Sequence, residues 1–375
     1  MQAPFGLSLT ASGHSNVKAS HSKTLEFVSE ADLTPRGTCV LGVALQGDLD
    51  ALARLRGAAT ISLDCQGVTE QLRATLNPAW LPGEPLILRR RQQPLARRTF
   101  GFAADKGAAD LDRAFVAALA NPKARLDIGI QPLGAELPSG ALFLARPEGR
   151  EDARLTAARA LADLHLSESL GGLEAEISAG GRVLLESGDP ALQAEAVRSV
   201  AELGGQTTLV GGWSAAEGAR ALSGLAAINW SHLMRWPNGR PARRDLLARL
   251  ADSGAGLLLP LPAGQGEGLL PLLVKALGDR SAALVTAPNR PQEELRRGDM
   301  VVLADTSLPR EETWLVVAES NVLGDASVLD PKLALLAKRL QAAGVATKTL
   351  ATALAETQQL SKRDVFNALV QDQKD

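Results

Sequence analysis

The ten residues GRVLLESGDP, at positions 181–190, decide the fold of the second half of the chain. They contain a short apolar run, Val183–Leu185, that stops abruptly at Ser187, Gly188, Asp189 and Pro190. A buried β-strand that ends in a Gly/Asp/Pro turn has this pattern. In parallel α/β sheets, ligands bind just beyond the carboxyl ends of the strands. We therefore expect the second half of the chain to be built around this turn, and whether the turn holds a cofactor is left open.

The composition is typical of a globular protein. The 375 residues suffice for two or three domains, and 45% of them are hydrophobic and 22% charged. The formal net charge of −2 indicates neither nucleic acid nor membrane as a partner. No apolar run approaches the roughly 20 residues of a membrane span, and the N-terminus lacks the pattern of a signal peptide. Because Cys39 and Cys65 form no CxxC pair, we expect a cytoplasmic protein with reduced thiols, no bound metal and no membrane partner.

The chain has few aromatic residues and few histidines, which limits the catalytic and binding chemistry available to it. The chain has no Tyr, and aromatic residues make up 3% of it. This excludes phenolic acid–base catalysis and weakens any mode of RNA binding that depends on aromatic stacking. A His-based catalytic centre would have to draw on His14, His21, His165 and His232.

Residues 1–130 predict an α+β domain with a largely antiparallel sheet. Alternating patterns predict strands at residues 24–32, 39–46, 59–65, 67–76 and 97–105. The sequence PLILRRRQQP, at 85–94, has the pattern of an edge strand that ends in a basic run. Helical spacing over 106–120 places Leu111, Phe115, Val116 and Leu119 on one face.

Three blocks of this region carry a resemblance: GHSNVKASHSKTLEF at 13–27, LTPRGTCVLGV at 33–43 and RRTFGFAADKGAADLDRAF at 97–115. In this order they resemble the archaeal domain-of-unknown-function family three-seven-one, over about residues 12–130. The matching positions are Gly13, His14, His21, Thr24, Glu26, Thr34, Gly37, Cys39, Arg98, Thr99, Asp105, Lys106 and Arg113. The chain departs from the family pattern at Thr38 and over Arg89–Arg91. The family implies no function that can be carried over.

Two sets of polar residues in this domain are candidate sites. The first is a polar cluster formed by His14, His21, Glu26, Asp105 and Lys106. Its alternative is that the acidic and basic residues cap or pair along the helix and that the histidines lie in loops. The second is a set of phosphate-contact candidates, Arg89, Arg90, Arg91, Arg97 and Arg98. Its alternative is a solvated edge strand whose charges prevent pairing with other sheets.

A Pro- and Gly-rich linker is expected at residues 131–140, before a second domain at 141–320. The landmarks of this second domain are P-x-G at 147–149, LTAARAL at 155–161, VLLESGDP at 183–190, GWSAAEGA at 212–219 and a loop with Glu293 and Glu294. In this order they resemble the tetrapyrrole methylase superfamily, which implies a two-lobed α/β methylase that binds S-adenosylmethionine between its lobes.

The resemblance also implies which residues contact the cofactor. They are Pro147, Gly149, Gly188, Asp189, Pro190, Ser214 and Ala215. Glycine loops suit such a site because the main chain can approach a ligand closely, and the alternative is that each glycine only makes a turn. The stretch from Leu161 to Gly181 is shorter than in the superfamily, and Arg146 and Glu148 are bulky for the first loop. A catalytically degenerate descendant is therefore the second interpretation.

Residues 328–375 predict a small helical module with helices at 331–344, 345–359 and 361–371. The sequence LSKRDVFNALV, at 360–370, resembles the ending of the ribosomal small-subunit RNA methyltransferase I family. This resemblance implies rRNA processing by 2′-O-methylation of a ribose, and RNA or a ribosomal subunit as the partner. The superfamily also implies a homodimer.

No catalytic residue can be named from the sequence, and Glu168 and His232 are the remaining candidates for a general base. Two other functions stay open. One is a non-catalytic binding or scaffold protein whose working part is the N-terminal domain. The other is a porphyrinoid methylase.

Overall fold

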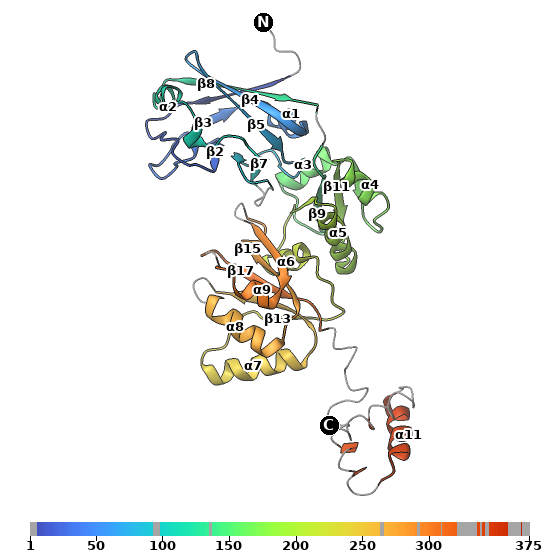
Figure 1. Ribbon diagram of the computed structural model, residues 1–375. Coiled ribbons are helices and arrows are strands. Elements are labelled where there is room, and N and C mark those ends of the chain that lie inside the picture. The colour runs from blue at the N-terminus through green and yellow to red at the C-terminus, as the bar shows by residue number, and fades with distance from the viewer. Residues whose placement is uncertain are drawn as a thin grey trace. The chain divides into compact units, whose positions relative to one another are not determined.

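The computed structural model is a mixed α/β protein whose helices and strands are shown in Figure 1. It describes residues 6–92, 98–134, 137–262, 266–290, 293–308, 310–320, 336–337, 340–341, 345–358 and 369. The chain forms two compact units, Met1–Glu319 and Ser320–Asp375. The domain bounds predicted from the sequence stay a prediction. In the described part of the chain, no helix combines the length and the apolar character needed to cross a membrane.

The first unit begins with a closed β-barrel whose strands follow one another in the order β1-β3-β2-β6-β7-β5-β4-β8 (Figure 1). The strands are β1 (Leu7–Ser12), β2 (Thr24–Phe27), β3 (Val40–Gln46), β4 (Gly57–Cys65), β5 (Val68–Leu76), β6 (Leu86–Arg89), β7 (Thr99–Phe102) and β8 (Arg125–Pro132). Most neighbours pair antiparallel, whereas β2–β3 and β6–β7 run parallel. The predicted antiparallel character is therefore confirmed, but closure of the sheet into a barrel was not predicted.

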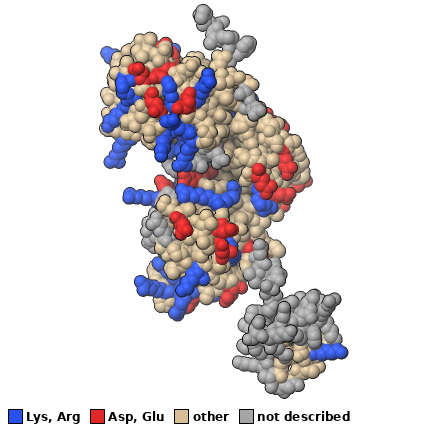
Figure 2. All heavy atoms as spheres, in the orientation of Figure 1, with Lys and Arg blue, Asp and Glu red and all other residues tan. Residues whose placement is uncertain are grey.

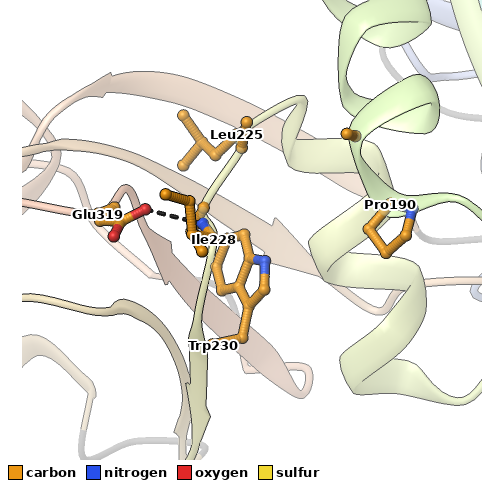
Figure 3. Close-up of a pocket in the computed structure, with 8 residues that line it drawn as sticks. Pro190, Leu225, Ile228, Trp230 and Glu319 are labelled. Atoms are coloured by element: carbon orange, nitrogen blue, oxygen red, sulfur yellow. Dashed lines mark hydrogen bonds between the residues drawn. The ribbon is translucent and has the colours of Figure 1, made fainter.

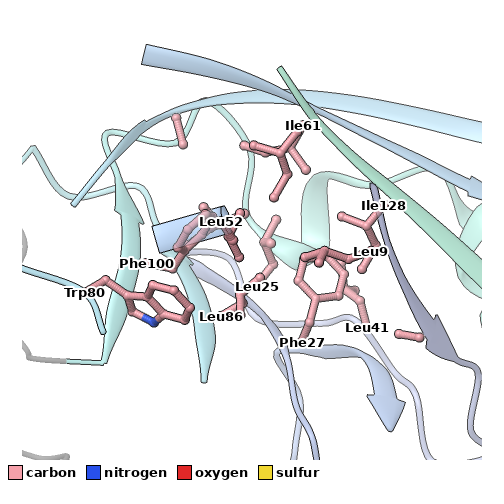
Figure 4. Packing of buried hydrophobic residues seen from close by; sticks show 14 of the residues in the cluster. Leu9, Leu25, Phe27, Leu41, Leu52, Ile61, Trp80, Leu86, Phe100 and Ile128 are labelled. Carbon is pink, nitrogen blue, oxygen red and sulfur yellow. The ribbon is translucent and has the colours of Figure 1, made fainter. Parts of the chain in front are cut away.

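Closure turns one face of each strand toward a shared core. In β4, Ile61 and Leu63 are buried while Ser62 is exposed, because successive side chains point to opposite faces. Figure 4 shows this core, in which the rings of Trp80 and Phe100 meet edge to face with centroids 5.2 Å apart. Two helices pack against the barrel, α1 (Leu49–Arg54) and α2 (Arg113–Leu119).

The prediction of an edge strand at residues 85–94 is wrong. Strand β6 pairs with β2 on one side and with β7 on the other, because the barrel is closed. Leu86, Ile87 and Leu88 are all buried, and the basic run begins where the strand ends. The arginines therefore do not protect an open sheet edge.

The helix predicted over residues 106–120 is shorter in the structure. A 3₁₀ turn, η1 (Ala108–Asp110), precedes α2, and Leu111 between them is extended. The helix begins late because the carboxylate of Asp112 accepts a hydrogen bond from the Ala114 N–H at 2.6 Å, as an N-cap does. The predicted apolar face is confirmed, since Phe115 and its neighbours on that face are buried.

The next part is a parallel sheet in the order β10-β11-β9-β12. Its strands are β9 (Ala141–Ala145), β10 (Leu164–Leu166), β11 (Arg182–Glu186) and β12 (Gln206–Leu209). Its helices are α3 (Ala153–Leu161), α4 (Leu173–Ser178), α5 (Pro190–Glu202) and α6 (Ala215–Ser223). The buried strand predicted at Val183–Leu185 is confirmed as β11, which pairs on both sides. Phe143 and Leu184 of this sheet belong to the same hydrophobic core as the barrel.

Arg182, the first residue of β11, links this sheet to the barrel. The residue is 1% exposed, and its Nε and Nη2 donate hydrogen bonds to the carbonyls of Pro78 at 2.8 Å and Ala53 at 2.5 Å. Burial, followed by the charge of Arg56, lowers the pKa of Arg182 to about 10, so the guanidinium stays charged at neutral pH. The carboxylate of Asp163 accepts hydrogen bonds from the Arg182 N–H at 2.8 Å and from Arg56 Nη2 at 2.5 Å.

A mixed sheet in the order β13-β14-β17-β15-β16 completes the first unit. Its strands are β13 (Trp230–His232), β14 (Gly256–Leu261), β15 (Ser281–Thr286), β16 (Glu294–Asp299) and β17 (Thr313–Val317). Its helices are α7 (Arg240–Asp252), α8 (Gly266–Leu277) and α9 (Met300–Ala304). Helix α6 packs against β12 of the parallel sheet and against β15 and β17 of this sheet, so Trp213 and Trp314 join one core.

The second unit contains α11 (Thr347–Gln358), which matches the helix predicted at 345–359. Leu350, Ala351 and Leu354 of this helix form a small core with Ala337 and Leu369. The helices predicted at 331–344 and 361–371 lie largely outside the described residues, as does the sequence LSKRDVFNALV.

We expect Arg182→Leu to lower the free energy of unfolding by about 2–4 kcal/mol. The change removes two hydrogen bonds from a charged donor and leaves two buried carbonyls unpaired. Urea unfolding followed by tryptophan fluorescence measures the loss. The matched control is Arg125→Leu, which removes an exposed pair with Asp127 and should cost no more than about 0.5 kcal/mol. Equal losses in the two variants would contradict the linking role of Arg182.

Candidate functional site

The loops that follow β9, β11 and β12 lie at one edge of the parallel sheet, because the carboxyl ends of parallel strands share an edge. These loops and the helix starts after them carry the residues that the methylase resemblance implied for a cofactor. The residues are Pro147, Gly149, Gly188, Asp189, Pro190, Ser214 and Ala215. The structure therefore brings the three predicted loops to the same edge.

The turn after β11 is held by its own hydrogen bonds. Asp189 is the N-cap of α5, and its carboxylate accepts from the Ala191 N–H at 2.8 Å. Pro190 stands at the start of the helix, where its missing N–H has no cost. The carbonyl of Ser187 accepts from the buried side chain of Gln193 at 2.6 Å. These contacts give Asp189 a structural role in starting α5.

Side chains bridge the loops after β9 and β12. Arg146 Nη1 donates to Glu217 Oε1 at 2.8 Å, and the Ser214 hydroxyl donates to Glu217 Oε2 at 2.7 Å. The Ser214 hydrogen bond lowers the pKa of Glu217 against the effect of burial, and the charge of Arg146 lowers it further. Glu217 therefore holds the two loops together as an ionised carboxylate.

The glycines of these two loops face neighbouring protein atoms. A Cβ added to Gly149 would lie 2.9 Å from the Arg146 carbonyl oxygen, and one added to Gly212 would lie 2.9 Å from the Arg150 Cβ. Gly149 therefore lies in a tight turn of its own loop, and the main chain at Gly212 packs against Arg150. With the Arg146–Glu217 pair, these contacts hold the two loops close to each other.

A pocket of about 300 Å³ lies beside the start of α5 (Figure 3). Its lining residues are Pro190, Ala191, Leu225, Ala226, Ala227, Ile228, Trp230 and Glu319. The Glu319 carboxylate accepts from the Ile228 N–H at 2.8 Å, as the dashed line in Figure 3 marks. A Cβ added to Gly188 would meet nothing within 4 Å, so Gly188 borders open space. Pro190 is the cofactor-binding candidate that this pocket includes.

The two candidates for a general base lie on the surface. Glu168 is exposed after β10, and His232 is exposed with its ring centroid 5.4 Å from that of Trp314. A catalytic role for either residue stays a prediction.

A second pocket, of about 330 Å³, lies where β2, β3, β6 and β7 come together in the barrel. We call it the arginine pocket. Its lining residues are His21, Lys23, Thr24, Glu26, Cys39, Ile87, Arg89, Arg91, Arg98 and Glu294. Figure 2 shows Lys and Arg side chains gathered along a rim of the barrel domain, with acidic groups among them.

Strand register explains why distant residues meet in this pocket. Across β2 and β6, Thr24 pairs with Arg89 and Glu26 pairs with Ile87. The Glu26 N–H donates to the Cys39 carbonyl at 3.0 Å, which fixes the start of β3 beside β2. Arg89 and Arg91 line the pocket, whereas Arg90, the residue between them, pairs with Asp110 at 3.0 Å. The three neighbouring arginines therefore do not act as one group.

The positive charges of the pocket are only partly balanced by its two carboxylates, Glu26 and Glu294. Burial lowers the pKa of Arg89, and the charges of Arg98 and Arg91 lower it further, while Glu294 and Glu26 oppose this effect. Within the described ranges, the buried Nε atoms of Arg89 and Arg98 have no hydrogen-bond partner. An anion in the pocket would relieve the repulsion among the guanidinium groups and supply acceptors for their N–H donors.

Cys39 is not a nucleophile at neutral pH. Its thiol donates to Glu26 Oε2 at 3.2 Å. Burial and then the charge of Glu26 raise the pKa of Cys39 to about 12, so the thiolate is scarce. In the part of the chain that the structure describes, no three His, Cys, Asp or Glu side chains meet as a metal site would require.

The structure divides the predicted polar cluster. His21 and Glu26 line the arginine pocket, together with the predicted phosphate contacts Arg89, Arg91 and Arg98. The remaining members make contacts of their own: the His14 ring accepts from the Asn16 N–H, Asp105 accepts from the Arg73 N–H, and Lys106 pairs with Glu70. Arg97 lies outside the described residues.

Five lining residues, Lys23, Thr24, Cys39, Ile87 and Glu294, were not predicted as site residues. Thr24 and Cys39 are positions that match the N-terminal family, and that was the available signal for them. Glu294 comes from β16, far along the chain, and no local sequence pattern connects it with the barrel.

Comparison with known proteins identifies the barrel region. Residues 9–132 match the family model described as "Domain of unknown function (DUF371)", so the resemblance predicted for about residues 12–130 is confirmed. An uncharacterized protein of Methanocaldococcus jannaschii is 28% identical over 123 residues, which cover 31% of this chain and 91% of that protein.

Solved structures with similarity to the chain include methyltransferases. The methyltransferase CobJ is 18% identical with a TM-score of 0.24, covering 48% of this chain and 95% of that one. A putative diphthine synthase from Entamoeba histolytica is 12% identical with a TM-score of 0.23, covering 48% of this chain and 92% of that one. Similarities at this level carry no inference about cofactor or substrate.

We expect Cys39 to react with iodoacetamide at pH 8 far more slowly than an exposed cysteine. With a pKa of about 12, roughly one thiol in 10⁴ is ionised at that pH. In Glu26→Gln the negative charge and the accepting carboxylate are removed, so the pKa falls and the labelling rate rises. Peptide mapping by mass spectrometry separates Cys39 from Cys65. The control is Glu30→Gln in the exposed loop after β2, and a rate that is unchanged in Glu26→Gln would refute the Glu26–Cys39 contact.

Proposed function

We propose that this chain is a non-catalytic binding protein that takes an anionic ligand in the arginine pocket of its barrel. The observation that carries the proposal is the set of three guanidinium groups, those of Arg89, Arg91 and Arg98, around one cavity. The charges of Arg91 and Arg98 act against the charged form of Arg89, so the cavity holds an excess of positive charge. A phosphate-bearing ligand offers the acceptors and the negative charge that this arrangement lacks.

In this proposal the methylase-like part is a scaffold. The order of strands, loops and helices from β9 to β17 supports a two-lobed fold of the tetrapyrrole methylase type. The Arg146–Glu217 bridge and the packing of Gly212 against Arg150 support loss of the cofactor space between those loops. Methyl transfer requires a cofactor held in a fixed orientation, and loops that are bridged by their own side chains disfavour such binding.

Methylation of ribosomal RNA is the second candidate function. It is favoured by one observation, the pocket at Pro190 with Gly188 bordering open space next to it. RNA or a ribosomal subunit as a partner, and a homodimer, belong to this candidate and stay predictions.

Calorimetry with inorganic pyrophosphate tests the anion site. We expect the wild type to bind pyrophosphate. In Arg89→Gln the dissociation constant should be roughly 10- to 100-fold larger, because charge-assisted hydrogen bonds contribute about 1.5–3 kcal/mol each. Arg90→Gln is the matched control: it removes a neighbouring charge that pairs with Asp110 outside the pocket, and it should change affinity less than about 3-fold. Equal weakening in both variants would show only diffuse electrostatic attraction.

Calorimetry with S-adenosylmethionine tests the second candidate. We expect no binding heat at high micromolar cofactor, because the Arg146–Glu217 pair bridges the two loops and Arg150 packs against Gly212. Pyrophosphate titrated into the same sample shows that the protein is folded and active in binding. A micromolar dissociation constant for S-adenosylmethionine would restore the methyltransferase interpretation.

A further inference from the structure

Glu26 gives the arginine pocket a property that a simple anion site does not need. Its carboxylate lines the same cavity as Arg89, Arg91 and Arg98, and its charge acts on Arg89. Two like charges about 4 Å apart repel by roughly 4 kcal/mol at an effective dielectric constant of 20. A carboxylate in this position therefore works against the binding of a bare anion.

A carboxylate helps binding when the ligand brings hydrogen-bond donors. Glu26 Oε2 accepts from the Cys39 thiol, a weak donor, and an ionised carboxylate has about four acceptor positions. The other carboxylate oxygen is Oε1, and within the described ranges Glu26 makes no ion pair with a basic side chain. Hydroxyl groups of a ligand would use this acceptor capacity.

The dimensions and walls of the pocket also favour a ligand larger than an inorganic ion. Its volume of about 330 Å³ is near the lower limit of small-molecule sites. Ile87, which pairs with Glu26 across β2 and β6, adds apolar surface to the lining. A sugar ring has both hydroxyl donors and apolar C–H surface.

We propose that the arginine pocket binds a phosphorylated pentose, with the phosphate on the arginines and the sugar hydroxyls on Glu26. The proposal rests on the anion-binding function proposed above and specifies its ligand class. A free pentose phosphate and a nucleoside monophosphate share this chemistry. A nucleic acid strand does not suit the pocket as well, because each of its internal phosphates is a diester and each internal sugar keeps at most the 2′-hydroxyl.

The test is calorimetry of the full chain with four ligands: inorganic phosphate, ribose 5-phosphate, 2-deoxyribose 5-phosphate and adenosine 5′-monophosphate. We expect ribose 5-phosphate to bind at least 10-fold more tightly than inorganic phosphate. We expect 2-deoxyribose 5-phosphate to bind several-fold more weakly than ribose 5-phosphate. If adenosine 5′-monophosphate binds more tightly than ribose 5-phosphate, the ligand is a nucleoside monophosphate. If the two bind equally, the base adds nothing and the ligand is a free pentose phosphate.

The variant Glu26→Gln distinguishes the contribution of Glu26 to sugar binding from that of the arginines to phosphate binding. In this variant, ribose 5-phosphate should lose its advantage, while phosphate should bind equally or more tightly because a repelling charge is gone. Glu30→Gln, outside the pocket, should leave both affinities unchanged. If Glu26→Gln does not fold, the comparison of ribose with deoxyribose in the wild type still decides the question.

Three results would overturn the inference. They are equal binding of phosphate and ribose 5-phosphate, equal weakening of both ligands in Glu26→Gln, and tighter binding of a single-stranded RNA oligonucleotide than of either pentose ligand. In the first two cases, loss of phosphate binding in Arg89→Gln would still uphold the anion site. If no phosphate-containing ligand binds, the proposed function itself fails.

Discussion

The buried guanidinium of Arg182 is the interaction on which the arrangement of the first unit depends. It lies at the first residue of β11, in the middle of the parallel sheet, and its two donors reach carbonyls that belong to the barrel. A charge buried this deeply is tolerated only when hydrogen bonds satisfy it, so the carbonyls of Pro78 and Ala53 must stay within reach. Because the barrel core continues onto Phe143 and Leu184, burial of apolar surface and pairing of the guanidinium favour the same geometry.

The same physical rule distinguishes the loops after β9 and β12 from the arginine pocket. Between the loops after β9 and β12, the side chains of Arg146, Glu217 and Ser214 satisfy one another. In the arginine pocket, charges of one sign predominate, and buried donors on Arg89 and Arg98 remain without partners in the described part of the chain. A region whose polar groups are mutually satisfied is stable without a ligand, whereas an unbalanced pocket gains stability when one binds. This contrast, and not the likeness of the fold, directs attention to the barrel.

Sequence patterns predicted local structure well where the signal is itself local. The run Val183–Leu185 and the Gly/Asp/Pro turn after it indicated β11 and its end, because apolar runs and turn residues act over a few residues. That Asp189 and Pro190 start α5 was not predicted. These local patterns did not predict closure of the barrel. Closure depends on the pairing of β1 with β8, and these strands lie near opposite ends of the domain's sequence. For the same reason, β6 looked like an edge strand.

The site was partly predictable on the same grounds. The arginines at 89, 91 and 98 and the acid at 26 stood out by residue type, but their meeting depends on the register of β2 against β6. Register is a property of paired strands and leaves little trace in one sequence. His14, Asp105 and Lys106 were grouped with them because they share a family pattern, yet each makes contacts elsewhere.

The pairing of β1 with β8, from Leu7 opposite Ile130 to Ser12 opposite Arg125, has a consequence for synthesis on the ribosome. The first strand of the barrel is made at the start of translation, but one of its two neighbours is made about 120 residues later. At roughly 5–20 residues per second, an unpaired strand edge persists for roughly 6–25 s in the nascent chain. During that interval the edge is open to pairing with other chains. The barrel is thus a late-closing domain, and its vulnerability to aggregation is set by elongation speed as much as by its final stability.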